Sequence, residues 1–263
     1  MVTFGFIGCG NMGGALIRAL CAVIAPEQVK ITDLAKEKAE QLAKETGASF
    51  AEKEDIAAHC DYIFLGVKPQ GMQKLAEEVR GTLEKRTDRF VLVTMAAGIA
   101  MEKLCGWFGD YPVIRIMPNL PVSVGEGMIL WCTQNTTEDE TAVFADAMRG
   151  AGKLLRIDEG KIDAGSAVSG CGPAYAFLFL EALADGGVRC GLSRADAMLL
   201  AAQTLVGSAE MVLKTGRHPG DLKDAVCSPG GTTIEGVLAL EEGAFRSDTA
   251  KAVIAAYEKT RKL

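Results

Sequence analysis

The stretch Val2-Thr3-Phe4-Gly5-Phe6-Ile7-Gly8-Cys9-Gly10-Asn11-Met12-Gly13 decides the fold. A mostly apolar run over residues 2–7 is followed at once by a Gly-x-Gly-x-x-Gly pattern, and apolar residues then recur with helical spacing. Strand, glycine turn and helix in this order form the context in which the pattern predicts dinucleotide binding. Gly8 would make the tight turn, Gly10 would admit the pyrophosphate, and Gly13 would let the helix pack on the strand. The predicted cofactor contacts here are Gly8, Cys9, Gly10, Asn11 and Met12.

A second predicted strand, residues 29–32, ends at Asp33, twenty residues beyond Gly13. An acidic residue at this position usually binds the adenosine ribose hydroxyls and disfavours an extra 2′-phosphate. Asp33 is therefore a further predicted cofactor residue.

Strand and helix signals alternate through the first 120 residues. Strands are expected at 62–67, 90–95 and 113–117, and helices at 36–44 and 72–83. Two more strand candidates, 128–132 and 154–157, flank a helix around 138–148. Such alternation predicts a doubly wound α/β sheet of the Rossmann type with parallel strands.

The pattern changes near residue 160, where strand signals end. Apolar helical segments follow at 174–188, 194–214, 233–241 and 248–262. We expect a dinucleotide-binding domain over 1–158 and an all-α domain over 159–263. Residues 174–183 are apolar on nearly every face, so this helix needs cover all round. A small domain has little interior to provide it, and the sequence therefore predicts a homodimer formed through the C-terminal helices.

Three segments follow predicted strands, where ligands bind in open α/β sheets. Val67, Lys68 and Pro69 follow one strand, Ala96, Ala97 and Gly98 the next, and Pro118 and Asn119 a third. Small residues at 96–98 would let a flat ring lie against the backbone, Pro118 would form an apolar wall for a nicotinamide, and Asn119 would hydrogen-bond nearby. A surface lysine at position 68 and simple packing space at 96–98 remain alternatives.

Composition excludes several classes of function. The chain has 263 residues and a net charge of −6 without a basic run, which argues against nonspecific nucleic-acid binding. Its eight cysteines stand singly with no C-x-x-C pair, which predicts reduced thiols, no metal site and a cytoplasmic protein. No membrane association is expected, because the longest apolar run is too short to span a bilayer.

The segment Ser228-Pro229-Gly230-Gly231-Thr232-Thr233 precedes another predicted helix. Unpaired N–H groups and the helix dipole at such an N-terminus suit a carboxylate or phosphate, and the glycines allow close approach. An ordinary capped turn is the alternative. No catalytic His-plus-carboxylate relay is recognisable, whereas a C=N acceptor needs mainly binding, orientation and desolvation.

The chain resembles the pyrroline-5-carboxylate reductase family over its whole length. The matching segments are 6–14, 67–69, 96–99, 115–121, 169–175, 181–187, 222–224, 228–233, 240–243 and 245–247. The resemblance implies reduction of 1-pyrroline-5-carboxylate, a cyclic imino acid, to L-proline by NADPH or NADH. It assigns the substrate carboxylate to Ser228, Gly230, Gly231, Thr232 and Thr233, with Thr233 the catalytic residue near the ring nitrogen. It also implies a homodimer or a larger oligomer built from dimers, with the substrate site at the dimer interface.

One departure concerns the segment Asp33-Leu34-Ala35-Lys36. Many relatives carry a small or amide residue followed by arginine here, which suits the 2′-phosphate of NADPH. Asp33 predicts a penalty for NADPH, which Lys36 and Lys38 would offset if they fold over the phosphate. The competing hypotheses are a reductase of another cyclic imine or small acid, and a nonenzymatic nicotinamide sensor.

Overall fold

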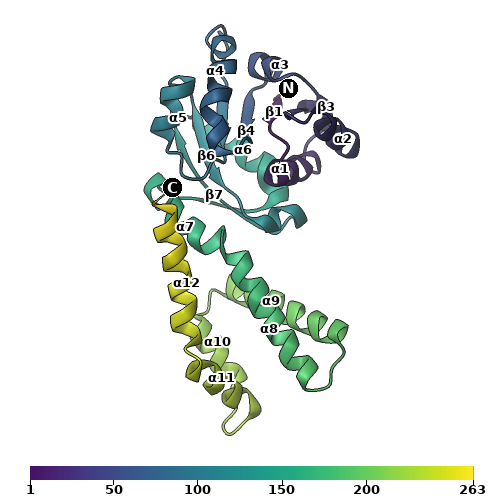
Figure 1. Ribbon diagram of the computed structural model, residues 1–263, viewed down its shortest axis with the longest axis vertical. Coiled ribbons are helices and arrows are strands. Elements are labelled where there is room, and N and C mark those ends of the chain that lie inside the picture. The colour runs from purple at the N-terminus through teal and green to yellow at the C-terminus, as the bar shows by residue number, and fades with distance from the viewer. Residues whose placement is uncertain (263) are drawn as a thin grey trace. The chain divides into compact units, whose positions relative to one another are not determined.

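The computed structural model describes residues 1–262, which form two compact units (Figure 1). One unit contains residues 1–170 together with the end of the chain from Tyr257, and the other contains residues 171–256. The boundary predicted near residue 158 lies one short helix before this division. As a domain limit it stays a prediction.

The first unit is built on one eight-stranded sheet in the order β3-β2-β1-β4-β5-β6-β7-β8. Its strands are β1 (Phe4–Ile7), β2 (Val29–Thr32), β3 (Ser49–Phe50), β4 (Tyr62–Leu65), β5 (Val91–Thr94), β6 (Val113–Met117), β7 (Gly127–Gln134) and β8 (Gly152–Arg156). The first six are parallel, which confirms the predicted Rossmann-type sheet. Strand β7 is antiparallel to β6, because the nine residues between them are too few for a crossover connection.

Helices cover both faces of this sheet (Figure 1). The helices of the first unit are α1 (Asn11–Cys21), α2 (Lys36–Thr46), α3 (Lys53–His59), α4 (Met72–Leu83), α5 (Met101–Phe108), α6 (Glu138–Ala147) and α7 (Ile162–Ser169). Side chains of β4 alternate between the two layers: Phe64 packs with α1 and α6, and Ile63 and Leu65 pack with α3, α4 and α5. The alternation follows from the two-residue period of a strand. Sequence patterns did not single out the short elements β3, α3, α5 and α7.

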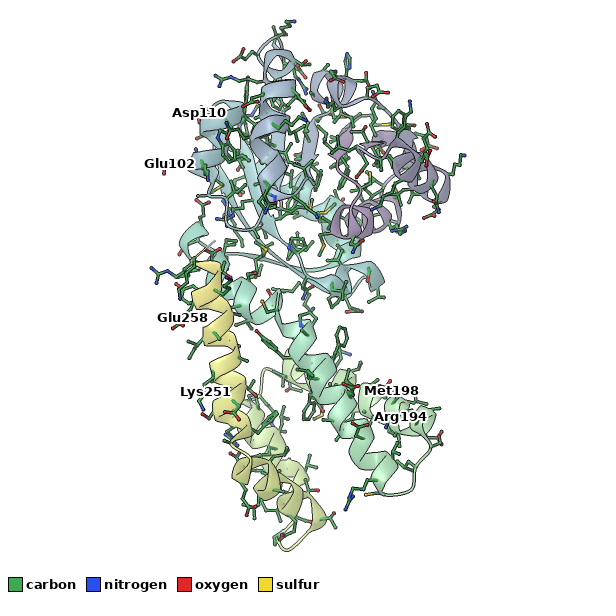
Figure 2. The ribbon with its side chains drawn as sticks, viewed as in Figure 1. Glu102, Asp110, Arg194, Met198, Lys251 and Glu258 are labelled. Atoms are coloured by element: carbon green, nitrogen blue, oxygen red, sulfur yellow. The ribbon has the colours of Figure 1, made fainter. Side chains whose placement is uncertain are left out.

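The second unit consists of helices alone. They are α8 (Gly172–Arg189), α9 (Arg194–Thr215), α10 (Pro219–Val226), α11 (Thr232–Glu242) and α12 (Phe245–Thr260), of which α10 was not predicted and α12 continues into the first unit. Helices α8 and α9 pack through three alanines, Ala184, Ala197 and Ala201, which form the buried cluster of this unit. Figure 2 labels Arg194 and Met198 on α9; the Arg194 guanidinium lies 2.6 Å from the Asp185 carboxylate, and Met198 is 38% exposed. Large apolar side chains of α8 and α9, such as Leu178 and Leu199, are two-thirds exposed.

Candidate functional site

The glycine turn lies where the strand order of the sheet reverses. Ile7, the last residue of β1, pairs with Thr32 on one side and Leu65 on the other. The Gly8 N–H donates to the Thr32 carbonyl at 2.8 Å. Gly8 has a φ of +113°, and a Cβ there would come within 2.6 Å of the Gly66 carbonyl. Only glycine fits this turn, and the reversal point is where open α/β sheets bind ligands.

The other two glycines differ in role: Gly13 allows close packing, and Gly10 leaves space for a ligand. A Cβ on Gly13 would lie 2.3 Å from the Gly8 carbonyl oxygen, so Gly13 lets α1 approach the turn. A Cβ on Gly10 would meet no atom of the described residues within 4 Å. Gly10 is the N-cap of α1, whose first turn carries no acidic side chain. The open space over these N–H groups fits the pyrophosphate of a dinucleotide.

Asp33 is fixed at the end of β2 by two backbone hydrogen bonds. Its Oδ2 accepts from the Cys9 N–H at 2.6 Å, and its Oδ1 accepts from the Ala35 N–H at 3.0 Å. Burial, and next the Asp33 charge, raises the pKa of the Cys9 thiol to about 12. The Cys9 side chain is therefore a neutral packing group under the turn.

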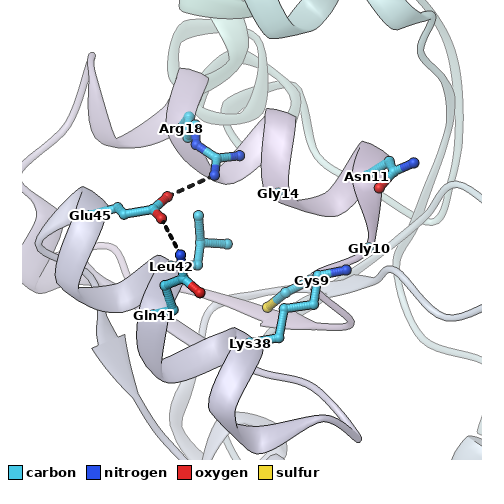
Figure 3. A pocket seen from close by; sticks show the side chains of 9 residues that line it. All are labelled: Cys9, Gly10, Asn11, Gly14, Arg18, Lys38, Gln41, Leu42 and Glu45. Atoms are coloured by element: carbon cyan, nitrogen blue, oxygen red, sulfur yellow. Dashed lines mark hydrogen bonds and ion pairs between the residues drawn. The ribbon is translucent and has the colours of Figure 1, made fainter.

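A cavity of about 230 Å³ opens between α1 and α2 beside Gly10 (Figure 3). Lys38 lies near Cys9 and Gly10, whereas Arg18, Gln41 and Glu45 form a polar cluster at its other end. The Glu45 carboxylate accepts from Arg18 at 2.8 Å and from Gln41 at 3.0 Å. The sequence analysis considered Lys38 only as a contact for a 2′-phosphate and did not predict Arg18, Gln41 or Glu45 as site residues. The spacing 38, 41, 45 places Lys38, Gln41 and Glu45 on one face of α2.

Two further turns lie at the same edge of the sheet. Val67 packs on the core, Lys68 is exposed, and Pro69 starts a short 3-10 turn after β4. Ala96 is buried, whereas Ala97 and Gly98 are exposed and Gly98 has a φ of +73°. The backbone at 97–98 is exposed, and its contact with a flat ring stays a prediction.

Pro118 and Asn119 are both buried. The Asn119 side-chain amide donates to the Ser169 carbonyl at 2.9 Å, and its oxygen accepts from the Met128 N–H at 2.8 Å. Asn119 thus joins the end of β6 to β7 and to the end of α7. A nicotinamide contact by these two residues stays a prediction.

Arg115, Glu159 and Asp163 form an ion-pair cluster that is linked to the start of α5, just after the turn at 96–98. Arg115, 4% exposed, places one guanidinium nitrogen 2.9 Å from Glu159 and another 3.5 Å from Asp163. The same Glu159 oxygen accepts from the N–H of Met101, the first residue of α5, at 2.7 Å. The cluster therefore fixes the start of α5, and the turn before it, to the segment that leads into α7.

The second unit presents the segment 228–233 at the start of α11. Gly230 has a φ of +66°, and the Gly231 N–H donates to the Ser228 carbonyl at 3.0 Å. Gly231 is the N-cap of α11 and has no side chain to occupy the N–H groups of the first turn. Ser228, Gly230 and Thr232 are exposed, and Thr233 is partly buried.

Thr233 also lines an apolar groove of about 740 Å³ formed by α8, α11 and α12. Leu178, Leu183 and Leu240 contribute to its walls, and each is at least 42% exposed. Such a large exposed apolar surface indicates an interaction site for protein. Within residues 1–262 no three metal-ligating side chains gather, and the eight cysteines are free thiols.

A dinucleotide-binding sheet joined to a helical unit with an uncovered apolar groove defines a class, the two-domain nicotinamide-dependent oxidoreductases that dimerise through helices. Comparison with known proteins supports each half. Residues 3–98 match the family described as NADP oxidoreductase, coenzyme F420-dependent, and residues 159–263 match the family described as pyrroline-5-carboxylate reductase dimerisation.

Whole-length relatives specify the family. The chain is 42% identical to pyrroline-5-carboxylate reductase of Escherichia coli, over 98% of this chain and 97% of the relative. It is 41% identical to that of Arabidopsis thaliana, over 98% and 94%. The solved pyrroline-5-carboxylate reductase of Coxiella burnetii aligns with a TM-score of 0.91 at 30% identity, over 99% and 98% of the two chains. The Plasmodium falciparum pyrroline carboxylate reductase, solved with NADP bound, aligns with a TM-score of 0.87 at 33% identity, over 99% and 97%. This chain belongs to the pyrroline-5-carboxylate reductase family, which confirms the resemblance seen in its motifs.

Proposed function

We propose that this protein reduces 1-pyrroline-5-carboxylate to L-proline with NAD(P)H, the last step of proline synthesis. The observation that carries the proposal is the start of α11, where a glycine-rich segment leaves the N–H groups of the first turn without a side-chain cap. In a chain that matches reductases of this substrate over 98% of its length, that helix N-terminus is the carboxylate site.

The first unit supplies the cofactor half of the reaction. Gly8 to Met12 bind the pyrophosphate, and Asp33 binds the adenosine ribose. The turns at 67–69 and 96–98 receive the nicotinamide riboside, with Pro118 and Asn119 behind them. The bound dinucleotide supplies a hydride. The role of the turns is to hold the nicotinamide flat and to exclude water from its reactive face.

The second unit supplies the substrate half. The N–H groups of Thr232 and Thr233 hold the carboxylate. Ser228, Gly230 and Gly231 shape the segment, because the Gly231 N–H donates to the Ser228 carbonyl at 3.0 Å. An iminium nitrogen already carries the positive charge that activates its carbon, so no strong general acid is needed. The Thr233 hydroxyl accepts a hydrogen bond from the ring N–H and orients the C=N bond.

The apolar groove beside Thr233 is the surface that a second subunit covers. Two helical stretches, 159–189 and 194–215, are long and apolar enough by composition to cross a membrane, and few of their residues are buried. The match of 159–263 to a dimerisation family favours a subunit interface for these faces. A soluble cytoplasmic homodimer, or a larger assembly of dimers, is our inference.

The direct test follows absorbance at 340 nm after 1-pyrroline-5-carboxylate is added to purified protein with NADH or NADPH, and identifies the product. We expect stoichiometric formation of L-proline. Nicotinamide binding without oxidation would overturn the proposal and favour a nicotinamide sensor, while oxidation only with other cyclic imines would favour a different reductase.

Substitution at Thr233 tests the orienting role. Thr233→Ala should lower kcat/KM for 1-pyrroline-5-carboxylate by about 10- to 100-fold, which corresponds to about 1.4–2.7 kcal/mol of transition-state contact. Thr233→Ser should restore most of it, and the Kd of the nicotinamide should not change. Thr215→Ala, which removes a threonine hydroxyl from the end of α9, is the matched control. Wild-type turnover in Thr233→Ala would refute the role.

A further inference from the structure

The end of β2 carries charged side chains that bear on the choice between the two nicotinamide cofactors, and the inference drawn from them rests on the proposed function. The two cofactors differ by a phosphate on the adenosine 2′-oxygen. Three charged side chains close to this position have settled contacts in the structure: Asp33, Lys36 and Glu52.

Asp33 is held where a 2′-hydroxyl would lie. Both carboxylate oxygens are anchored, one by the Cys9 N–H at 2.6 Å and one by the Ala35 N–H at 3.0 Å. A carboxylate has about four acceptor positions, so two remain for ribose hydroxyls. The Cys9 N–H belongs to the glycine turn, and swinging the carboxylate aside for a phosphate would leave that N–H unpaired. The negative charge therefore stays in place for either cofactor.

Lys36 is turned away from this carboxylate toward β3. Its Nζ lies 3.5 Å from a Glu52 carboxylate oxygen and 4.7 Å from the centre of the Phe50 ring. The cation is thus shared between an anion and an aromatic face, in a pair whose two side chains are both more than half exposed. It has to leave both to reach a 2′-phosphate.

Lys38 is the other cation of this segment, and it points elsewhere. It lines the cavity between α1 and α2 beside Gly10 (Figure 3). That position suits the pyrophosphate, which both cofactors carry. Lys38 therefore strengthens binding of both without favouring one.

We propose that this protein selects NADH over NADPH, that anchored Asp33 is the selecting residue, and that the Lys36–Glu52 pair competes with the usual cationic compensation. The expected selectivity in kcat/KM is at least tenfold, equivalent to about 1.4 kcal/mol. From the sequence, Lys36 was expected to offset the penalty for NADPH if it folded over the phosphate; its pairing with Glu52 argues against that role.

The experiment measures Kd for NADH and for NADPH by nicotinamide fluorescence, in parallel with kcat/KM for each. Asp33→Asn keeps the shape and removes the charge, and it should move both ratios at least tenfold toward NADPH. Glu37→Gln removes an equal charge from an exposed site four residues on, and it should move the ratios less than twofold. Adding Glu52→Gln to Asp33→Asn frees Lys36 and should move them further toward NADPH.

Different results would overturn the cofactor preference and the proposed function. Equal or tighter binding of NADPH by the wild type, or an unmoved ratio in Asp33→Asn, would overturn the inference. A switch to NADPH in Glu52→Gln alone would also overturn it, because the ion pair and not Asp33 would then be the selector. Lys38→Gln should weaken both cofactors equally, and a loss confined to NADPH would place the 2′-phosphate at Lys38. Selective NADH binding without turnover would leave this inference standing and refute the proposed function.

Discussion

Removing the Glu159 carboxylate should destabilise the first unit and loosen the turn at 96–98, the proposed nicotinamide contact. Glu159 accepts two hydrogen bonds, from Arg115 at 2.9 Å and from the Met101 N–H at 2.7 Å. Arg115 is almost fully buried, and its Nε has no hydrogen-bond partner in the described structure. Without Glu159, its remaining carboxylate contact is the 3.5 Å pair with Asp163.

The size of the effect follows from these contacts. A hydrogen bond to a charged group contributes about 1.5–3 kcal/mol, and a broken buried ion pair costs about 3–5 kcal/mol. The Glu159 side chain is 31% exposed, so water reduces the loss. We expect Glu159→Ala to lower the free energy of unfolding by about 3 kcal/mol, or Tm by roughly 6–12 °C. Glu159→Gln keeps one oxygen acceptor and should lose about half as much.

The assay is urea unfolding followed by circular dichroism at fixed protein concentration, because dimerisation makes stability concentration-dependent. Glu126→Gln, at an exposed carboxylate, should stay within about 0.5 kcal/mol of wild type. Because Met101 starts the helix after the turn at 96–98, the KM for the nicotinamide should also rise in Glu159→Gln. Unchanged stability of Glu159→Ala would refute the reasoning, since it would mean that Arg115 is stabilised without this pair.

Three further predictions concern charge, the buried thiol and the groove. The Lys30 ammonium, hydrogen-bonded at 2.7 Å, lowers the pKa of Asp55. The stabilisation from Asp55 is therefore complete above its unfolded pKa of about 3.9 and is lost as pH falls through the folded pKa. Melting curves should separate Asp55→Asn from wild type at pH 7 and bring the two together near pH 2, and a constant gap would contradict the assignment. Burial raises the pKa of the Cys9 thiol to about 12, so Cys9 should resist iodoacetamide at pH 8 in the folded protein and react in urea. Mass spectrometry of the labelled peptide measures the difference. Rapid labelling of the folded protein would contradict a buried thiol. Leu178→Asp, in the apolar groove, should give a monomer by light scattering and abolish turnover. The control Leu34→Asp, at a side chain that is 98% exposed, should leave the dimer intact. A dimeric Leu178→Asp variant would place the interface elsewhere.

Local rules explain why much of the fold was predictable. The glycine turn between residues 8 and 13 has strict backbone requirements, so its sequence pattern carried through to β1, α1 and the cofactor class. Long apolar helices such as α8 and α9 could be predicted because their apolar residues extend over several helical turns. The short elements β3, α3, α5, α7 and α10 were missed, because two to eight residues give too little periodicity and their packing partners lie far away in the sequence.

Among the candidate site residues, those in local motifs could be predicted, and those positioned by distant partners could not. The sequence predicted ligand contacts at Asp33, because it follows a recognisable strand, and at Thr233, because it lies in a family motif at the start of a predicted helix. It did not show that Asn119 is engaged with Ser169 and Met128, since those partners lie 50 and 9 residues away. The cavity side chains Arg18 and Glu45 come from two helices that meet only in the folded sheet.

By itself the sequence determined the Rossmann-type sheet, the helical second half and the family, since glycine geometry, hydrophobic period and motif order are local properties of the chain. Only the tertiary structure decided where the charges around the cofactor point. Lys36 lies three residues from Asp33, yet its ammonium pairs with Glu52 and Phe50, whereas the Asp33 carboxylate pairs with the N–H of Cys9. Those partners come from neighbouring strands and turns, and a long flexible side chain settles on whichever opposite charge the folded sheet brings within reach.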